Sequence, residues 1–211
     1  MPRATFYFPQ GFLWGTATAA HQVEGGNTNN DWYAWEQGEG NIHAGDKSGR
    51  ACDWWAGRWR EDFDRARETH QNAHRLSLEW SRIQPEPERW EEHALDRYRD
   101  MLIGLRQRDM TAMVTLHHFN NPGWFEEIGG FTHHHALTVF DRYVAAVLEN
   151  LGDLVDEWIT INEPNIYAVK GFIEGVWPPG HRSPGQAVAV MQAMATAHIR
   201  SYGAIHRANP N

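Results

Sequence analysis

The stretch TAMVTLHHFN, residues 111–120, joins a short apolar strand to a polar end. Residues 111–116 are apolar enough for a buried strand, and two histidines, a phenylalanine and an asparagine follow without a break. The same arrangement occurs at residues 157–163, where EWITIN precedes Glu163. Such strands are typical of parallel-sheet enzymes, because their active sites lie at the carboxyl ends of the strands.

Outward from these two segments, strands and helices alternate along the chain. Apolar residues recur every three or four positions in the helical segments. Strands are predicted at residues 12–19, 73–80, 111–116 and 157–162, and helices at residues 53–69, 95–105, 140–151 and 188–205. Alternation predicts parallel strands with helical crossovers, in either a small doubly wound sheet or half of an eight-stranded α/β barrel. No linker divides residues 1–211, so we expect one domain.

Composition limits the classes of partner. The 211 residues are 41% hydrophobic and 22% charged, with 19 Lys+Arg, 27 Asp+Glu and a net charge of −8. That balance argues against nucleic acid and anionic membranes as partners. No apolar run is long enough for a membrane helix, and no secretory signal is visible. The one cysteine, Cys52, excludes an internal disulfide, so we expect a cytoplasmic protein.

Two further features favour carbohydrate as a ligand class without deciding it. The chain has 11 tryptophans. Most of these fit core packing, but indole also offers a flat apolar face and one N–H donor to the C–H surface of a sugar. Residues 25–49 are rich in Gly and Asn and form too long a segment for a simple connector, which indicates a functional loop.

Four motifs resemble, in order and spacing, those of glycoside hydrolase family 1. They are FLWGTATAAHQVEG at residues 12–25, HRLSLEWSRIQP at 74–85, VTLHHFNNPGW at 114–124 and WITINEPN at 158–165, with PPG-like spacing around residues 171–180. The resemblance implies a (β/α)8 TIM barrel, of which this chain supplies roughly the first four βα units. It also implies a retaining β-glycosidase that needs no cofactor and no metal.

The resemblance assigns roles to particular residues. Glu163 would be the general acid/base, and Asn162 would hydrogen-bond the sugar 2-OH. Gln22 and His118 would bind other hydroxyls of the sugar. Arg75 would hold the carboxylate of the nucleophile.

The resemblance also marks what this chain lacks. Phe119 stands where the family commonly has tryptophan, which keeps an apolar wall but loses an N–H donor. Retention needs a second carboxylate about 5 to 5.5 Å from the first, and the family supplies it from strand seven in an ENG context. The chain contains no ENG. We therefore expect β-glucosidase-like cleavage of a terminal β-linked sugar in the complete protein, and little or no activity in this chain without the missing C-terminal half of the barrel.

Two other functions remain open. One is a half-barrel that binds sugar without cleaving it, and the other is an assembly half that acts only with a second chain. Glu24 and Glu79 lie near strand ends, but neither matches a family nucleophile.

Other residues have a structural interpretation. His117 is expected to point to the opposite face of its strand from His118. Cys52 is expected to be a small buried side chain. The three histidines at residues 133–135 would splay apart on a helix, so a solvated helix start capped by Thr132 is favoured over a metal site.

Overall fold

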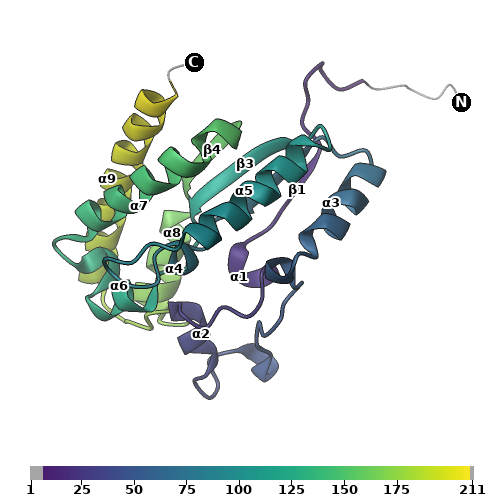
Figure 1. Cartoon of the computed structure of the whole chain (residues 1–211). Coiled ribbons are helices and arrows are strands. Elements are labelled where there is room, and N and C mark those ends of the chain that lie inside the picture. The colour runs from purple at the N-terminus through teal and green to yellow at the C-terminus, as the bar shows by residue number, and fades with distance from the viewer. Residues whose placement is uncertain (1–6, 210–211) are drawn as a thin grey trace, which may run out of the picture.

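A parallel sheet of four strands organises the computed structural model, which describes residues 7–209 (Figure 1). The strands are β1 (Gly15–Ala17), β2 (Ala73–Ser77), β3 (Thr111–His117) and β4 (Glu157–Ile161), and they lie side by side in chain order. A doubly wound sheet would place later strands on the other side of the first, so this order excludes that topology. The sheet is a consecutive arc of βα units, as half of a barrel requires.

Four long helices cover one side of the arc (Figure 1). They are α3 (Trp59–Glu68), α5 (Glu92–Arg106), α7 (Ala136–Leu151) and α9 (Pro184–Ala208). Each helix contacts the next in chain order. Their apolar stripes form one core with the sheet, in which Phe63, Leu102, Phe140 and Val190 are fully buried.

Local backbone signals set the ends of these helices. Helix α9 begins earlier than the apolar stripe predicted, because the Ser183 side chain accepts a hydrogen bond from the backbone of Gln186 and Pro184 occupies the first turn. Helix α3 begins later than predicted. Asp53 and Gly57 have φ values of 59° and 102°, and these left-handed residues bracket a separate 3-10 turn, η2 (Trp54–Ala56).

Short helices lie at the carboxyl ends of the strands, at the opposite end of the molecule from the termini (Figure 1). They are α1 (Ala20–Val23), α2 (Asp31–Glu36), α4 (Trp80–Ile83), α6 (Gly123–Glu127) and α8 (Pro164–Ala168). The remaining turns are η1 (His43–Gly45), η3 (Gly130–Thr132), η4 (Gly152–Leu154) and the π-helical η5 (Val169–Glu174). The second predicted strand is therefore shorter than expected, because Trp80 already belongs to α4.

Two expectations about single residues were wrong. Cys52 is exposed rather than buried, because it lies in the loop before α3 and not in the core. Thr132 does not cap α7: it lies in η3, and the helix begins at Ala136 after His135, which makes no side-chain cap bond. Residues 133–135 thus precede the helix. Between residues 7 and 209, no cluster of His, Cys, Asp or Glu has the arrangement of a metal site.

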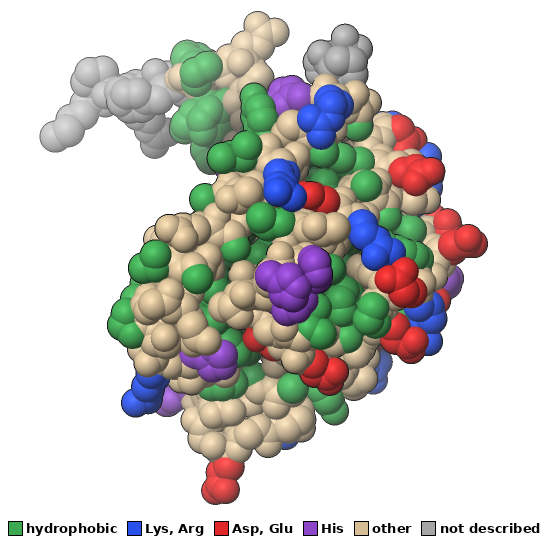
Figure 2. Space-filling model, turned by 90° about the vertical axis from the view of Figure 1, so that its left-hand side faces the viewer, with side chains coloured by type: hydrophobic (Ala, Val, Ile, Leu, Met, Phe, Trp, Pro, Cys, Tyr) green, Lys and Arg blue, Asp and Glu red, His purple; other side chains and the backbone are tan. Residues whose placement is uncertain are grey.

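The two edge strands of the arc are open. All three residues of β1 are exposed, and Phe12 and Trp14 beside it are exposed as well. At the other edge, a groove of about 660 Å³ runs between β4 and α9. Helix α9 leaves Ile199 68% and Tyr202 56% exposed. Figure 2 views the molecule from the α7 and α9 side and shows hydrophobic side chains scattered over that face. In the part of the chain described, no helix is long and apolar enough to cross a membrane.

We predict that the 211-residue chain self-associates in solution through these edges, because unpaired strands and apolar side chains without an opposite wall favour contacts between molecules. Sedimentation velocity over a range of concentrations should show species larger than a monomer. Ile159→Lys on β4 should reduce the association, and Ile103→Lys on α5, away from both edges, should not. A monomer that unfolds in one sharp transition would contradict this expectation.

Candidate active site

A hollow of about 530 Å³ opens at the carboxyl ends of β1 and β3. Three residues that the motifs assigned to sugar binding, Gln22, His118 and Phe119, line it. Gln22 lies in α1, and the other two follow β3 directly. The structure therefore brings together side chains that are about 96 positions apart in the sequence, as the parallel arrangement of the strands predicted.

Aromatic residues that the motifs did not assign form one wall of this hollow. The ring of Trp177 lies 5.0 Å from that of Phe119 and 5.3 Å from that of Trp32, between ring centroids. Trp32 belongs to the long segment 25–49, which was expected to be functional, and Trp177 belongs to the PPG-like stretch. A row of aromatic faces beside polar groups suits the alternating apolar and hydroxyl surfaces of a saccharide.

A buried carboxylate fixes the loop that borders the hollow. Glu36 accepts a hydrogen bond from the backbone N–H of Ser48 at 3.1 Å and from its hydroxyl at 3.0 Å. The other oxygen of Glu36 lies 2.7 Å from Nε2 of His21. His21, Glu36 and Ser48 all line the hollow. The segment that was expected to be a functional loop therefore forms one wall of the hollow.

His118 is a neutral hydrogen-bonding group. Burial and, to a smaller extent, the positive charge of Arg75 together lower its pKa to about 4. Its Nδ1 is buried and has no partner among the described residues. At neutral pH the imidazole is therefore uncharged and available for hydrogen bonds rather than for charge pairing.

Arg75 within β2 and Asn162 and Glu163 directly after β4 form a second group. Arg75 donates from Nε to the Thr115 hydroxyl at 3.0 Å and from Nη2 to Oδ1 of Asn162. Burial lowers the pKa of Arg75, and the negative charge of Glu163 opposes that shift. Because the Asn162 oxygen already accepts from Arg75, its NH2 group remains to donate to a ligand.

Glu163 sits on a constrained turn. Its φ is 42°, in the left-handed region, and it is the N-cap of α8, whose first residue is Pro164. Such a conformation costs on the order of 1 to 3 kcal/mol for a non-glycine residue and is common at active sites. The carboxylate is exposed. Glu163, Asn162 and Arg75 are not part of the lining of the hollow, but the positive charge of Arg75 acts on His118, which does line it.

Two other carboxylates near strand ends, Glu24 and Glu79, are buried and hydrogen-bonded to protein groups. Glu24 accepts from Nε of Arg82 at 2.7 Å and from the Tyr98 hydroxyl at 2.6 Å, and burial raises its pKa to about 7. Glu24 and Glu79 are 3% and 1% exposed, and neither lines the hollow. Both carboxylates are buried in hydrogen-bond networks, which indicates that they stabilise the fold.

His117 also has a structural environment. It is 1% exposed, its Nε2 lies 3.1 Å from Oδ1 of Asn121, and its ring packs edge-on against Phe131 and Tyr167. His118, by contrast, faces the hollow, so the two consecutive histidines point in different directions, as predicted.

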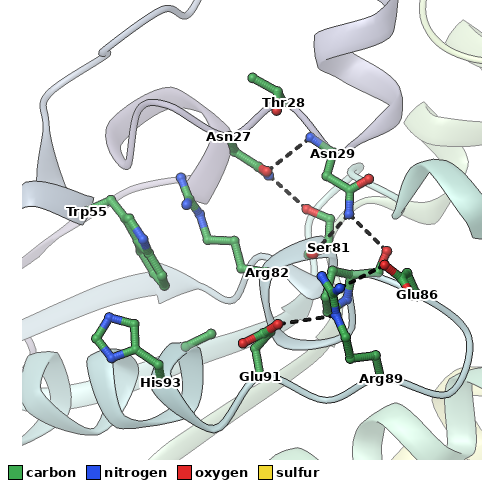
Figure 3. Close-up of a pocket in the computed structure, with 12 residues that line it drawn as sticks. Asn27, Thr28, Asn29, Trp55, Ser81, Arg82, Glu86, Arg89, Glu91 and His93 are labelled. Atoms are coloured by element: carbon green, nitrogen blue, oxygen red, sulfur yellow. Dashed lines mark hydrogen bonds and ion pairs between the residues drawn. The ribbon is translucent and has the colours of Figure 1, made fainter.

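A second hollow, of about 560 Å³, lies outside this site beside α4 and the start of α5 (Figure 3). Its two arginines are already paired with carboxylates. Arg82 contacts Glu24, and Arg89 contacts Glu86 at 2.8 Å and Glu91 at 3.2 Å. These pairs leave the hollow without the excess charge that a charged ligand would need.

An arc of βα units with polar groups along its carboxyl edge is the architecture of α/β-barrel proteins. Within that class, the model of glycosyl hydrolase family 1 matches residues 4–211. The chain belongs to this family, and its sheet is the first half of the family's (β/α)8 barrel.

Known proteins similar to this chain are β-glycosidases. β-Glucosidase A of Thermotoga maritima is 35% identical over 200 residues, which are 92% of this chain and 45% of the relative. A solved β-glycosidase from Pyrococcus horikoshii is 39% identical with a TM-score of 0.87, over 94% of this chain and 46% of that one. The Thermotoga maritima β-glucosidase in complex with glucoimidazole is 34% identical with a TM-score of 0.91, over 95% and 46%. The chain thus spans about half the length of these relatives.

Proposed function

We propose that this chain is the N-terminal half of a retaining β-glucosidase-like hydrolase, which cleaves a terminal β-linked sugar once a C-terminal half completes the barrel. The observation that carries the proposal is the placement of Glu163 and Asn162 at the end of β4, beside Arg75 and one strand from His118. A carboxylic acid, an amide donor and sugar-binding groups then lie along one edge of the sheet. Retaining glycoside hydrolysis requires these groups and, in addition, a nucleophilic carboxylate.

The chemical roles follow from the groups present. A glycosidic oxygen leaves easily only when it is protonated as the bond breaks, and Glu163 would supply that proton. Asn162 would donate from its NH2 group to the sugar 2-OH, since Arg75 occupies its oxygen. The second half would supply the nucleophilic carboxylate that attacks the anomeric carbon from the opposite side. Two carboxylates suffice for this reaction, so the proposal includes neither a metal nor a cofactor.

The partners of this chain would be a β-linked glycoside and the second half of the barrel. Glucosides are the substrate class that we favour, because the Thermotoga maritima relative is a β-glucosidase and its structure was solved in complex with glucoimidazole. The open edge of β4 favours assembly with a second half over an independent sugar-binding half-barrel. A cytoplasmic location remains a prediction.

Gln22 and His118 give the first test of this proposal. The test uses a completed barrel, made by joining this chain at Asn211 to the second half of Thermotoga maritima β-glucosidase A. Gln22→Ala and His118→Ala should each lower kcat/KM for a nitrophenyl β-glucoside by more than tenfold. The physical reason is that hydrogen bonds to sugar hydroxyls strengthen in the transition state.

His93→Ala is the matched control for this test. His93 is exposed and lines the hollow of Figure 3, outside the proposed sugar site. Its replacement should leave kcat/KM unchanged. If Gln22→Ala and His118→Ala both behave like His93→Ala, the edge of β1 and β3 is structural and the proposed sugar site is wrong.

A further inference from the structure

Asn120 is a polar residue of the hollow that the family motifs leave without a role. It follows Phe119, whose φ of 72° is left-handed, and it lines the hollow together with Gln22 and Trp177. Its Nδ2 donates a hydrogen bond to Oε2 of Glu79 at 2.9 Å. A carboxylate that follows the neighbouring strand β2 therefore holds this amide in place.

Glu79 is itself fixed from several sides. It is 1% exposed, and its Oε1 accepts from the Ser81 hydroxyl at 2.8 Å. The Ser81 oxygen in turn accepts from Nδ2 of Asn27 at 2.8 Å, a bond that Figure 3 shows beside the second hollow. The backbone N–H of Glu79 donates to the Tyr98 hydroxyl at 2.8 Å. Because Asn27 donates to Ser81, the hydroxyl proton of Ser81 is directed to Glu79, and the carboxylate acts as an acceptor for its neighbours.

The orientation of the Asn120 amide follows from this contact. Its nitrogen and oxygen differ by a flip of the side chain, but only the NH2 group donates to a carboxylate. The side-chain oxygen of Asn120 therefore points away from Glu79. Within residues 7–209 it accepts no hydrogen bond, and it is not enclosed by protein. A side-chain oxygen that is accessible on the wall of a hollow can accept a hydrogen bond from a hydroxyl group of a ligand.

We propose that Asn120 is a specificity-determining residue whose side-chain oxygen accepts a hydrogen bond from one saccharide hydroxyl, and that Glu79 is the positioning residue that holds this oxygen toward the hollow. The inference rests on the proposed function, because it takes the hollow to be a sugar site. It adds that the ligand must donate a hydrogen bond to the Asn120 oxygen. One hydroxyl of the sugar must donate, so an analogue with hydrogen or fluorine at that position loses the bond.

The test is a calorimetric titration of the 211-residue chain with methyl β-glucoside and with its monodeoxy analogues, which gives the dissociation constant of each. In the wild-type chain, one analogue should bind about 3- to 10-fold more weakly than the parent, as expected for one neutral hydrogen bond. Asn120→Ala should weaken the parent by the same factor and leave that analogue unchanged. The difference between parent and analogue should therefore disappear at one position of the sugar and persist at the others.

Substitutions at Glu79 separate positioning from a general effect on the fold. Glu79→Gln can still offer an oxygen to the Asn120 NH2 group and should retain the wild-type discrimination. Glu79→Leu has no acceptor, so it should lose the discrimination at the same sugar position as Asn120→Ala. Asn120→Ser is a milder variant that keeps a donor for Glu79 but withdraws the acceptor from the hollow. Asn29→Ala, in the other hollow, is the control and should bind like the wild type.

The outcomes distinguish this inference from the proposed function. If the wild-type chain binds glucosides and Asn120→Ala and Asn120→Ser keep its discrimination at every sugar position, the inference is overturned and the sugar site stands. Uniform weakening of all analogues by these variants would also overturn it, because that is the signature of a structural role. If the wild-type chain binds no saccharide at millimolar concentration, the inference is overturned, whereas the proposed function is judged separately by the Gln22 and His118 variants of the completed barrel.

Discussion

Glu163→Gln in the completed barrel is expected to lower the rate of hydrolysis of alkyl β-glucosides by roughly 10² to 10⁴. Glutamine keeps the shape of the side chain and cannot donate the proton that the leaving oxygen needs. A dinitrophenyl β-glucoside has a leaving group that needs no proton, so its glycosylation step should slow much less. Pre-steady-state kinetics on both substrates measure that step directly.

The control for this prediction is Glu174→Gln. Glu174 is an exposed carboxylate that pairs with Lys170 at 2.6 Å on the neighbouring turn η5. Its substitution removes a similar charge from the same region and should leave both substrates unaffected. Equal slowing of the glycosylation step for the alkyl and dinitrophenyl glucosides by Glu163→Gln would show that this residue is not the acid.

The isolated 211-residue chain is expected to have no turnover of β-glucosides near that of a complete enzyme. In the proposed mechanism Glu163 would offer a proton, but retention also needs a carboxylate on the opposite side of the anomeric carbon. Half of the substrate contacts would be missing too, so the substrate would be poorly oriented. Mixing the chain with a separately produced C-terminal half from Thermotoga maritima β-glucosidase A should restore hydrolysis of a nitrophenyl glucoside.

One result would contradict this second prediction directly. It is a burst of nitrophenol from the purified chain alone, abolished by Glu163→Ala, which would reveal a nucleophile within residues 1–211. Glu24 and Glu79 would then be the first candidates, although both are buried and already hydrogen-bonded. The control mixture contains the Glu163→Ala chain with the C-terminal half, which should assemble and stay inactive.

The order of the strands and the position of Glu163 after β4 were predictable because both depend on short-range patterns. An apolar run of five or six residues followed by polar groups predicts a strand and its carboxyl end, and β3 and β4 were located in this way. The motif around Glu163 needs no tertiary information, since its residues are adjacent. The local errors arose from backbone conformation. The left-handed residues Asp53 and Gly57 shift the start of α3 to Trp59. The spacing of apolar residues along a helix does not show where such backbone conformations occur.

The amino-acid sequence by itself therefore determined the family, the half-barrel and the side chains at the strand ends. Only the tertiary structure decided which of these side chains share a hollow. It placed Trp32 and Trp177 beside Phe119, and it turned the Asn120 oxygen outward by means of Glu79. It also buried Glu24 against Arg82, which a charge pattern along the chain does not reveal. The physical reason is that hydrogen-bond orientation and desolvation depend on residues far apart in the sequence, whereas periodicity reports only on near neighbours.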